Sequence, residues 1–127
     1  MSRPALHNGE WKAATVLAGA AIEALLHWKL GQLPPTEQAN GVSAAVSQGK
    51  LNQKPPANLD RWGLQDFIEV AGELKLIKPA TVAAATLARD FRNLIHPGAA
   101  ARRAEVCDRA TALSALAGRE HVVRDLS

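Results

Sequence analysis

Apolar side chains recur at helical spacing through most of this chain, and alanine supplies many of them. The chain has 25 alanines among its 127 residues, few aromatic residues and no tyrosine. Alanine is the best helix former, whereas strands favour aromatic and β-branched residues. The sequence therefore predicts an all-α fold, and its length predicts one domain, residues 1–127, around a single core.

The apolar spacing predicts four long helices, over about residues 10–30, 60–77, 80–95 and 100–117. Asn8 is expected to cap the first helix and Gly31 to end it. Its inward stripe comprises Trp11, Ala14, Ala18, Ala21, Ile22 and Leu25, widened by Leu17 and Leu26. In the last helix we expect Val106, Ala110, Leu113 and either Leu116 or Ala117 to face inward, and residues 119–127 to extend it or to form a short helix.

Residues 32–58 have a different composition, rich in proline, glycine, glutamine and asparagine. Thr36 is a candidate cap for a short helix through Val46, which Gly49 would end. We interpret the rest as a surface connection between core helices, with a functional loop as the alternative. The whole pattern predicts an antiparallel bundle of four long helices plus one or two short ones, with its core over about residues 10–117.

The charge of +3 and the pI of about 9.4 permit a nucleic-acid partner without requiring one. Cys107 is the single cysteine, which excludes an intrachain disulfide and suits a reducing cytoplasm. The four histidines are scattered singly, so we expect no metal site and no cofactor. The apolar stretch over residues 13–26 contains Glu23 and is short for a membrane span. We expect a soluble cytoplasmic protein with no signal peptide and no membrane partner.

The candidate site is the segment around Arg89, Asp90, Arg92, Asn93 and His96, where polar groups interrupt a helical run. Residues three, four or seven apart share one face of a helix, so these side chains are expected to gather. Two arginines can hold a phosphate, and a histidine can move protons near neutral pH. The competing interpretations are a solvated helix face and a helix-ending histidine bonded to a neighbouring carbonyl.

This segment, Arg-Asp-Phe-Arg-Asn-Leu-Ile-His-Pro-Gly, together with Val-Leu-Ala-Gly-Ala-Ala-Ile-Glu-Ala-Leu-Leu at residues 16–26, resembles the HEPN superfamily of small all-helical domains. In that family an arginine, usually followed by a polar residue, precedes a histidine by four to six intervening positions. Arg89 meets this spacing to His96, whereas Arg92 with Asn93 is the commoner dipeptide but has only three positions between the arginine and His96. The choice of motif arginine stays open between the two.

The resemblance implies a homodimer whose two motifs face one cleft, and a metal-independent ribonuclease of toxin–antitoxin, phage-defence or RNA-processing type. His96 would act as general base or acid, Arg89 and Arg92 would stabilise charge on phosphorus, and Asn93 would orient the histidine or the phosphate. The resemblance also suggests that Glu23 pairs with Arg89 or Arg92. The alternative for Glu23 is a solvated position at the edge of the apolar stripe.

Two further sets of residues have both a functional and a structural interpretation. Arg102 and Arg103 can extend a phosphate track or simply begin a solvated helix. Trp28 and Trp62 can stack bases, but packing in the core or in a dimer interface is the favoured interpretation.

The leading hypothesis is thus a dimeric HEPN-like ribonuclease with RNA as substrate and an antitoxin as a further partner. The rivals are a non-catalytic HEPN module that binds RNA, a nucleotide or a protein, and a pure dimerisation scaffold.

Overall fold

The structure is a computed structural model that describes residues 4–94 and 109–127, with side chains from residue 9 onward. Within these ranges the chain forms helices and no strand. The elements are α1 (Pro4–Gly31), α2 (Pro35–Ser47), the short 3-10 helix η1 (Leu59–Arg61), α3 (Leu64–Glu73), α4 (Pro79–Asn93) and α6 (Arg109–Leu126). The predicted all-α class is confirmed.

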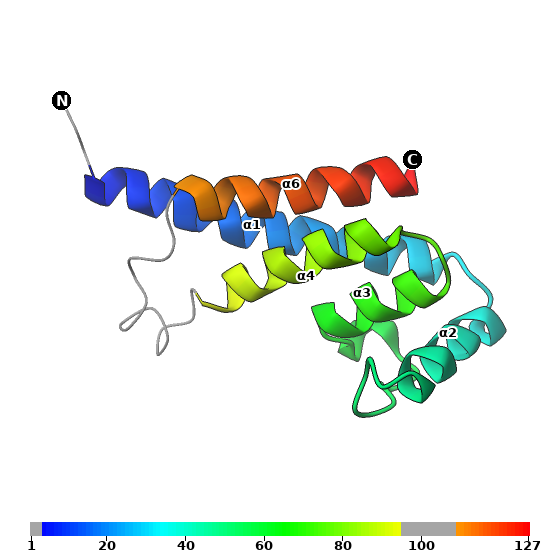
Figure 1. Ribbon diagram of the computed structural model, residues 1–127. Coiled ribbons are helices and arrows are strands. Elements are labelled where there is room, and N and C mark those ends of the chain that lie inside the picture. Colours follow the sequence, from blue (N-terminus) through cyan, green and yellow to red (C-terminus); the bar gives the residue numbers. More distant parts are fainter. Residues whose placement is uncertain (1–3, 95–108) are drawn as a thin grey trace.

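Helices α1, α4 and α6 pack along one another, while α2, α3 and η1 gather around the end of α1 (Figure 1). The excursion through α2 and α3 returns the chain to that end, so α4 runs opposite to α1. Helix α6 then runs opposite to α4 and therefore parallel to α1 (Figure 1). Helix α4 is thus antiparallel to α1 and α6, whereas α1 and α6 are parallel, so the predicted antiparallel bundle of four long helices is not confirmed.

One face of α1 is buried against the rest of the molecule. Its buried residues are Thr15, Ala18, Gly19, Ile22, Leu26 and Leu30. Leu26 is fully buried, whereas Leu17 is 68% exposed, so the two residues expected to widen the stripe behave differently. The buried face of α1 lies slightly to one side of the expected stripe because α1 packs against both α4 and α6.

Several predicted helix ends move in the structure. Helix α1 begins at Pro4 and passes through Asn8, so the expected asparagine cap is wrong, while its end at Gly31 is as predicted. Helix α2 begins at Pro35, with Pro34 and not Thr36 at the cap position. Gly49, just after α2, takes a positive φ of 74°, which suits glycine.

The helix expected over residues 60–77 is broken and shorter. Asn58 accepts a hydrogen bond from the Asp60 amide at 2.9 Å, which caps η1 instead of starting a long helix. Helix α3 then begins after Gly63, whose amide donates to Asp66 at 2.9 Å. It ends at Glu73, since Lys75 has a positive φ of 60° that interrupts the helical run before the predicted end at about residue 77.

The inward face of α6 also differs from the prediction. The buried residues are Thr111, Ala112, Ala115, Gly118 and Val122. Ala110 and Ala117 are exposed, Leu113 is 47% exposed, and Leu116 is partly buried against the core. Val106 lies outside the described residues. The periodicity placed the larger side chains inward, but small residues are what allow α6 to approach its neighbours closely. The segment over residues 119–126 extends α6, one of the two expected outcomes.

The end of α6 fastens the beginning of α4. The Asp125 carboxylate accepts hydrogen bonds from the Lys78 amide at 2.9 Å and from the Thr81 hydroxyl at 2.5 Å. Burial alone would raise the pKa of Asp125, but these bonds and the neighbouring Arg124 outweigh it and lower the pKa from 3.8 to about 2. A side chain from one helix therefore supplies the cap that the first turn of another lacks.

The part of α1 from Gly9 to Gly31 is long and apolar enough to cross a membrane, judged by length and composition alone. The estimate from residues 13–26 was therefore too short. The core helix of a soluble protein passes the same test, and α1 packs against α4 and α6 along its buried face.

Candidate functional site

The last turns of α4 carry the described part of the candidate site. Pro79 occupies the first turn of this helix, where its fixed φ is favourable, and the helix continues to Asn93. Arg89 and Arg92 are three residues apart and occupy adjacent turns of one side of α4. Asn93 is exposed at the end of the helix.

Arg92 lies against α1 in a space made by Gly19. A Cβ atom built at Gly19 would lie 2.7 Å from the Cδ of Arg92, so any side chain there would displace Arg92. The stem of Arg92 therefore crosses α1 where that helix has no side chain. One turn later on α1, Glu23 Oε1 accepts a hydrogen bond from Arg92 Nη1 at 3.3 Å. The expected pairing of Glu23 with Arg89 or Arg92 is confirmed, and the partner is Arg92.

The pair formed by Glu23 and Arg92 is partly open to solvent. Their side chains are 41% and 28% exposed, respectively. An ion pair with this exposure contributes at most about 1 kcal/mol to stability. Its main consequence is to fix where the Arg92 guanidinium points. The same exposure argues against the scaffold hypothesis in the form that seals these groups inside the bundle.

Arg89 has a different partner. Its Nη1 atom lies 3.2 Å from Asp90 Oδ1, on the next residue of the same helix. The Arg89 side chain is 26% exposed and that of Asp90 is 56% exposed. Two arginines and two carboxylates sum to a formal charge of zero in this cluster, so any added positive field must come from other residues. An incoming phosphate would compete with the carboxylates for the guanidinium groups.

Three residues of the predicted site, His96, Arg102 and Arg103, lie outside the described residues. The convergence of His96 with the two arginines and the proposed phosphate track stay predictions. Gly19 is the residue of this region that sequence reasoning missed. Its signal is a glycine one helical turn before Glu23, inside a run of good helix formers.

The two tryptophans considered for base stacking differ in burial. Trp62 is 7% exposed, its indole Nε1 donates to the Pro56 carbonyl at 2.6 Å, and its ring packs on Phe67 at 5.3 Å. It belongs to the core, as the favoured interpretation expected. Trp28 is 56% exposed on α1.

Within the described part of the chain, no three or more His, Cys, Asp or Glu side chains form a group suited to a metal ion. Comparisons of this chain with protein-family models, with curated proteins and with solved structures found no match. The resemblance to HEPN domains therefore depends on the sequence segments around Glu23 and His96 alone.

Proposed function

We propose that this chain is a HEPN-like, metal-independent ribonuclease or RNA-processing domain of toxin–antitoxin or phage-defence type. The observation that carries the proposal is the placement of Arg92 over Gly19 with its guanidinium on Glu23. That contact orients a cation at the end of α4, immediately before the His-Pro-Gly segment. A HEPN-like bundle is part of the same proposal.

In this mechanism the two arginines stabilise the charge that builds on the phosphorus oxygens. Arg92 is oriented in advance by Glu23, which lowers the cost of arranging it during the reaction. The Arg89 guanidinium releases the Asp90 carboxylate and binds the phosphate instead. His96 takes the proton of the ribose 2′-hydroxyl or gives one to the leaving oxygen, and Asn93 orients the histidine or the phosphate.

The proposal includes a homodimer, in which a second copy completes the cleft. Exposed apolar side chains on α1 support it. Leu17 and Trp28 are 68% and 56% exposed, and their eleven-residue separation brings them back to the same side of the helix. A homodimer is expected in sedimentation of the purified chain, and Leu17→Glu is expected to weaken it. A monomer at all concentrations would remove this part. We also propose a cytoplasmic location and an antitoxin-like protein partner.

The test is cleavage of RNA by the purified full chain in the presence of a chelator. The wild-type chain is expected to cut RNA, and His96→Ala is expected to abolish cleavage while circular dichroism shows unchanged helix content. Arg92→Gln is expected to lower the rate by about 10²-fold if its guanidinium stabilises the transition state. Failure to cut RNA, together with no toxicity on expression, contradicts the enzymatic proposal.

The alternative is a non-catalytic HEPN module that binds RNA, a nucleotide or a protein partner. The observation that favours it is the pairing of both arginines with carboxylates, which leaves the cluster without net charge. Binding of RNA without turnover, weakening as salt increases, would select this alternative.

A further inference from the structure

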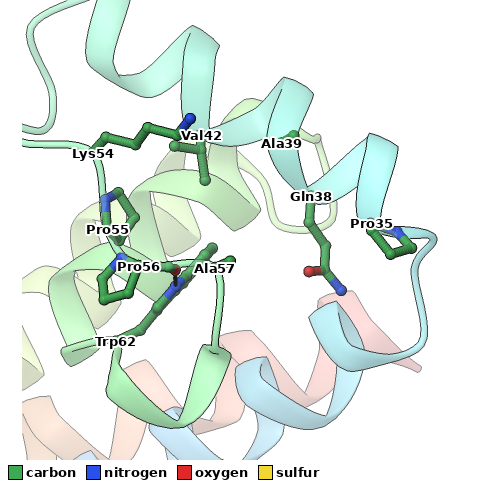
Figure 2. A pocket seen from close by; sticks show the side chains of 9 residues that line it. All are labelled: Pro35, Gln38, Ala39, Val42, Lys54, Pro55, Pro56, Ala57 and Trp62. Carbon is green, nitrogen blue, oxygen red and sulfur yellow. Dashed lines mark hydrogen bonds between the residues drawn. The ribbon is translucent and has the colours of Figure 1, made fainter.

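A small pocket lies at the other end of the molecule, between α2 and the proline-rich segment that precedes η1. Its volume is about 180 Å³. Figure 2 shows Pro55, Pro56 and Trp62 on one side and Val42 and Gln38 of α2 on the other. We call it the α2 pocket.

The walls of the α2 pocket are mostly apolar and held in place. Proline has no N–H group, so Pro35, Pro55 and Pro56 offer no backbone donor to a ligand. The only indole donor, Trp62 Nε1, is already bound to the Pro56 carbonyl at 2.6 Å. An apolar cavity of about 150 Å³ accepts benzene, so the α2 pocket has room for one aromatic ring.

One fixed acceptor faces the pocket. The Nε2 atom of Gln38 donates to the carbonyls of Leu30 at 2.9 Å and Leu33 at 3.1 Å, at the end of α1. Both hydrogens of the carboxamide are therefore in use, and the orientation of the group is fixed. Its oxygen turns toward the hollow in Figure 2. Such an acceptor selects a ligand that carries a hydrogen-bond donor.

The Lys54 side chain supplies a cation at the edge of the α2 pocket. Within the described part of the chain, the Lys54 ammonium has no hydrogen-bond or ion-pair partner. In Figure 2 it lies beside Val42, across the hollow from Gln38. A ligand that fills the pocket and reaches Lys54 gains from a negative charge at that end.

We propose that the α2 pocket binds a small phenolic carboxylate. The aromatic ring lies between Trp62 and α2, the phenol hydroxyl donates to Gln38 Oε1, and the carboxylate pairs with Lys54. The pocket volume limits the ligand to a single ring. This site is independent of the proposed ribonuclease site, which lies at the end of α4.

The test is titration of the full chain with 4-hydroxyphenylacetate, followed by NMR of the Trp62 indole N–H and by calorimetry. We expect a Kd on the order of 1 mM for a ligand of this size. Phenylacetate, which lacks the hydroxyl, should bind about five-fold more weakly. Lys54→Gln should weaken binding of the phenolic acid about two- to five-fold.

Ala39→Leu is the decisive variant, because Ala39 lines the pocket and a larger side chain there fills it without removing a hydrogen bond. It should abolish binding, whereas Ala83→Leu, at an exposed alanine of α4, should leave binding unchanged. No shift of the Trp62 signal at about 10 mM ligand, or equal binding by Ala39→Leu, overturns the proposal. A Tyr-Asp peptide that binds at least about ten-fold more tightly than the free acid also overturns it, in favour of a protein partner.

Discussion

The core is filled in two different ways at its two ends. Near the end of α1 it consists of large side chains, which include Ile22, Leu26, Leu30, Phe67 and Ile68. Between α4 and α6 it consists of small ones, which include Ala85, Ala88, Ala112, Ala115 and Gly118. The first region, the large-residue end, excludes water by filling space with side chains. The second region, the small-residue end, excludes water because the helix backbones approach closely.

This difference explains where the polar chemistry lies. Arg92 of α4 crosses α1 at Gly19, which leaves space for its long side chain, and it pairs with Glu23 of α1. The large-residue end holds the α2 pocket instead, because proline and tryptophan there leave a hollow that they cannot fill. The two ends should therefore respond to opposite kinds of substitution.

The largest effect is expected from removing volume at the large-residue end. Phe67 is 1% exposed and contacts both Trp62 and His27 through its ring. Phe67→Ala should lower the free energy of unfolding by about 3–5 kcal/mol, since it removes apolar burial and leaves a cavity. Urea denaturation measures this change. Leu87→Ala, at a side chain that is 44% exposed, is the control and should cost far less. Equal losses would mean that Phe67 is not central to this core.

Adding volume at the small-residue end comes next. A Cβ at Gly118 would lie 2.8 Å from the Ala84 carbonyl oxygen, which is backbone and cannot turn aside. Gly118→Val should therefore separate α4 from α6 and cost about 1–3 kcal/mol. Ala117→Val, at the exposed neighbouring position, is the matched control in the same thermal denaturation measurement. If the two variants have the same melting temperature, close packing of α4 against α6 does not stabilise this end of the molecule.

The contact of Asp125 on α6 with the first turn of α4 should make a smaller, pH-dependent contribution to stability. Asp125→Asn replaces charge-assisted hydrogen bonds to Lys78 and Thr81 by weaker ones and should cost about 1–2 kcal/mol at neutral pH. Because the pKa falls from 3.8 to about 2 on folding, the wild-type advantage is complete above pH 3.8 and disappears as the pH falls through about 2. Glu120→Gln, on the exposed side of α6, is the matched control in the same measurement. An advantage that persists below that pH would contradict this origin.

The same contrast explains how far the sequence could predict the structure. Apolar spacing locates α1 and α4, and the end at Gly31 follows from glycine chemistry. Apolar spacing does not predict the buried face of α6. It favours Leu113, which is exposed, over Gly118, whose small size allows the backbones to approach closely. The break before α3 was missed although its contacts are local, since Asn58 caps η1 and Trp62 binds the Pro56 carbonyl six residues away.

The candidate site was predictable to the same partial degree. The family resemblance suggested that Glu23 pairs with Arg89 or Arg92, and the structure shows the pair with Arg92. Which arginine it meets depends on how α1 and α4 cross. Only the position of Gly19 against Arg92 decides that, and helical spacing within one element contains no such information.

The smallest effect is expected at the polar pair itself. Glu23→Gln should lower the free energy of unfolding by at most about 1 kcal/mol, because both partners are partly solvated. Glu10→Gln, at an exposed acid of the same helix, is the control in urea denaturation. The NMR signal of the Arg92 side-chain Nε–H should nevertheless shift in Glu23→Gln, since its guanidinium loses a charged partner. A loss above about 2 kcal/mol would place the pair among the core interactions of the fold, and the contrast between the large-residue and small-residue ends would then fail.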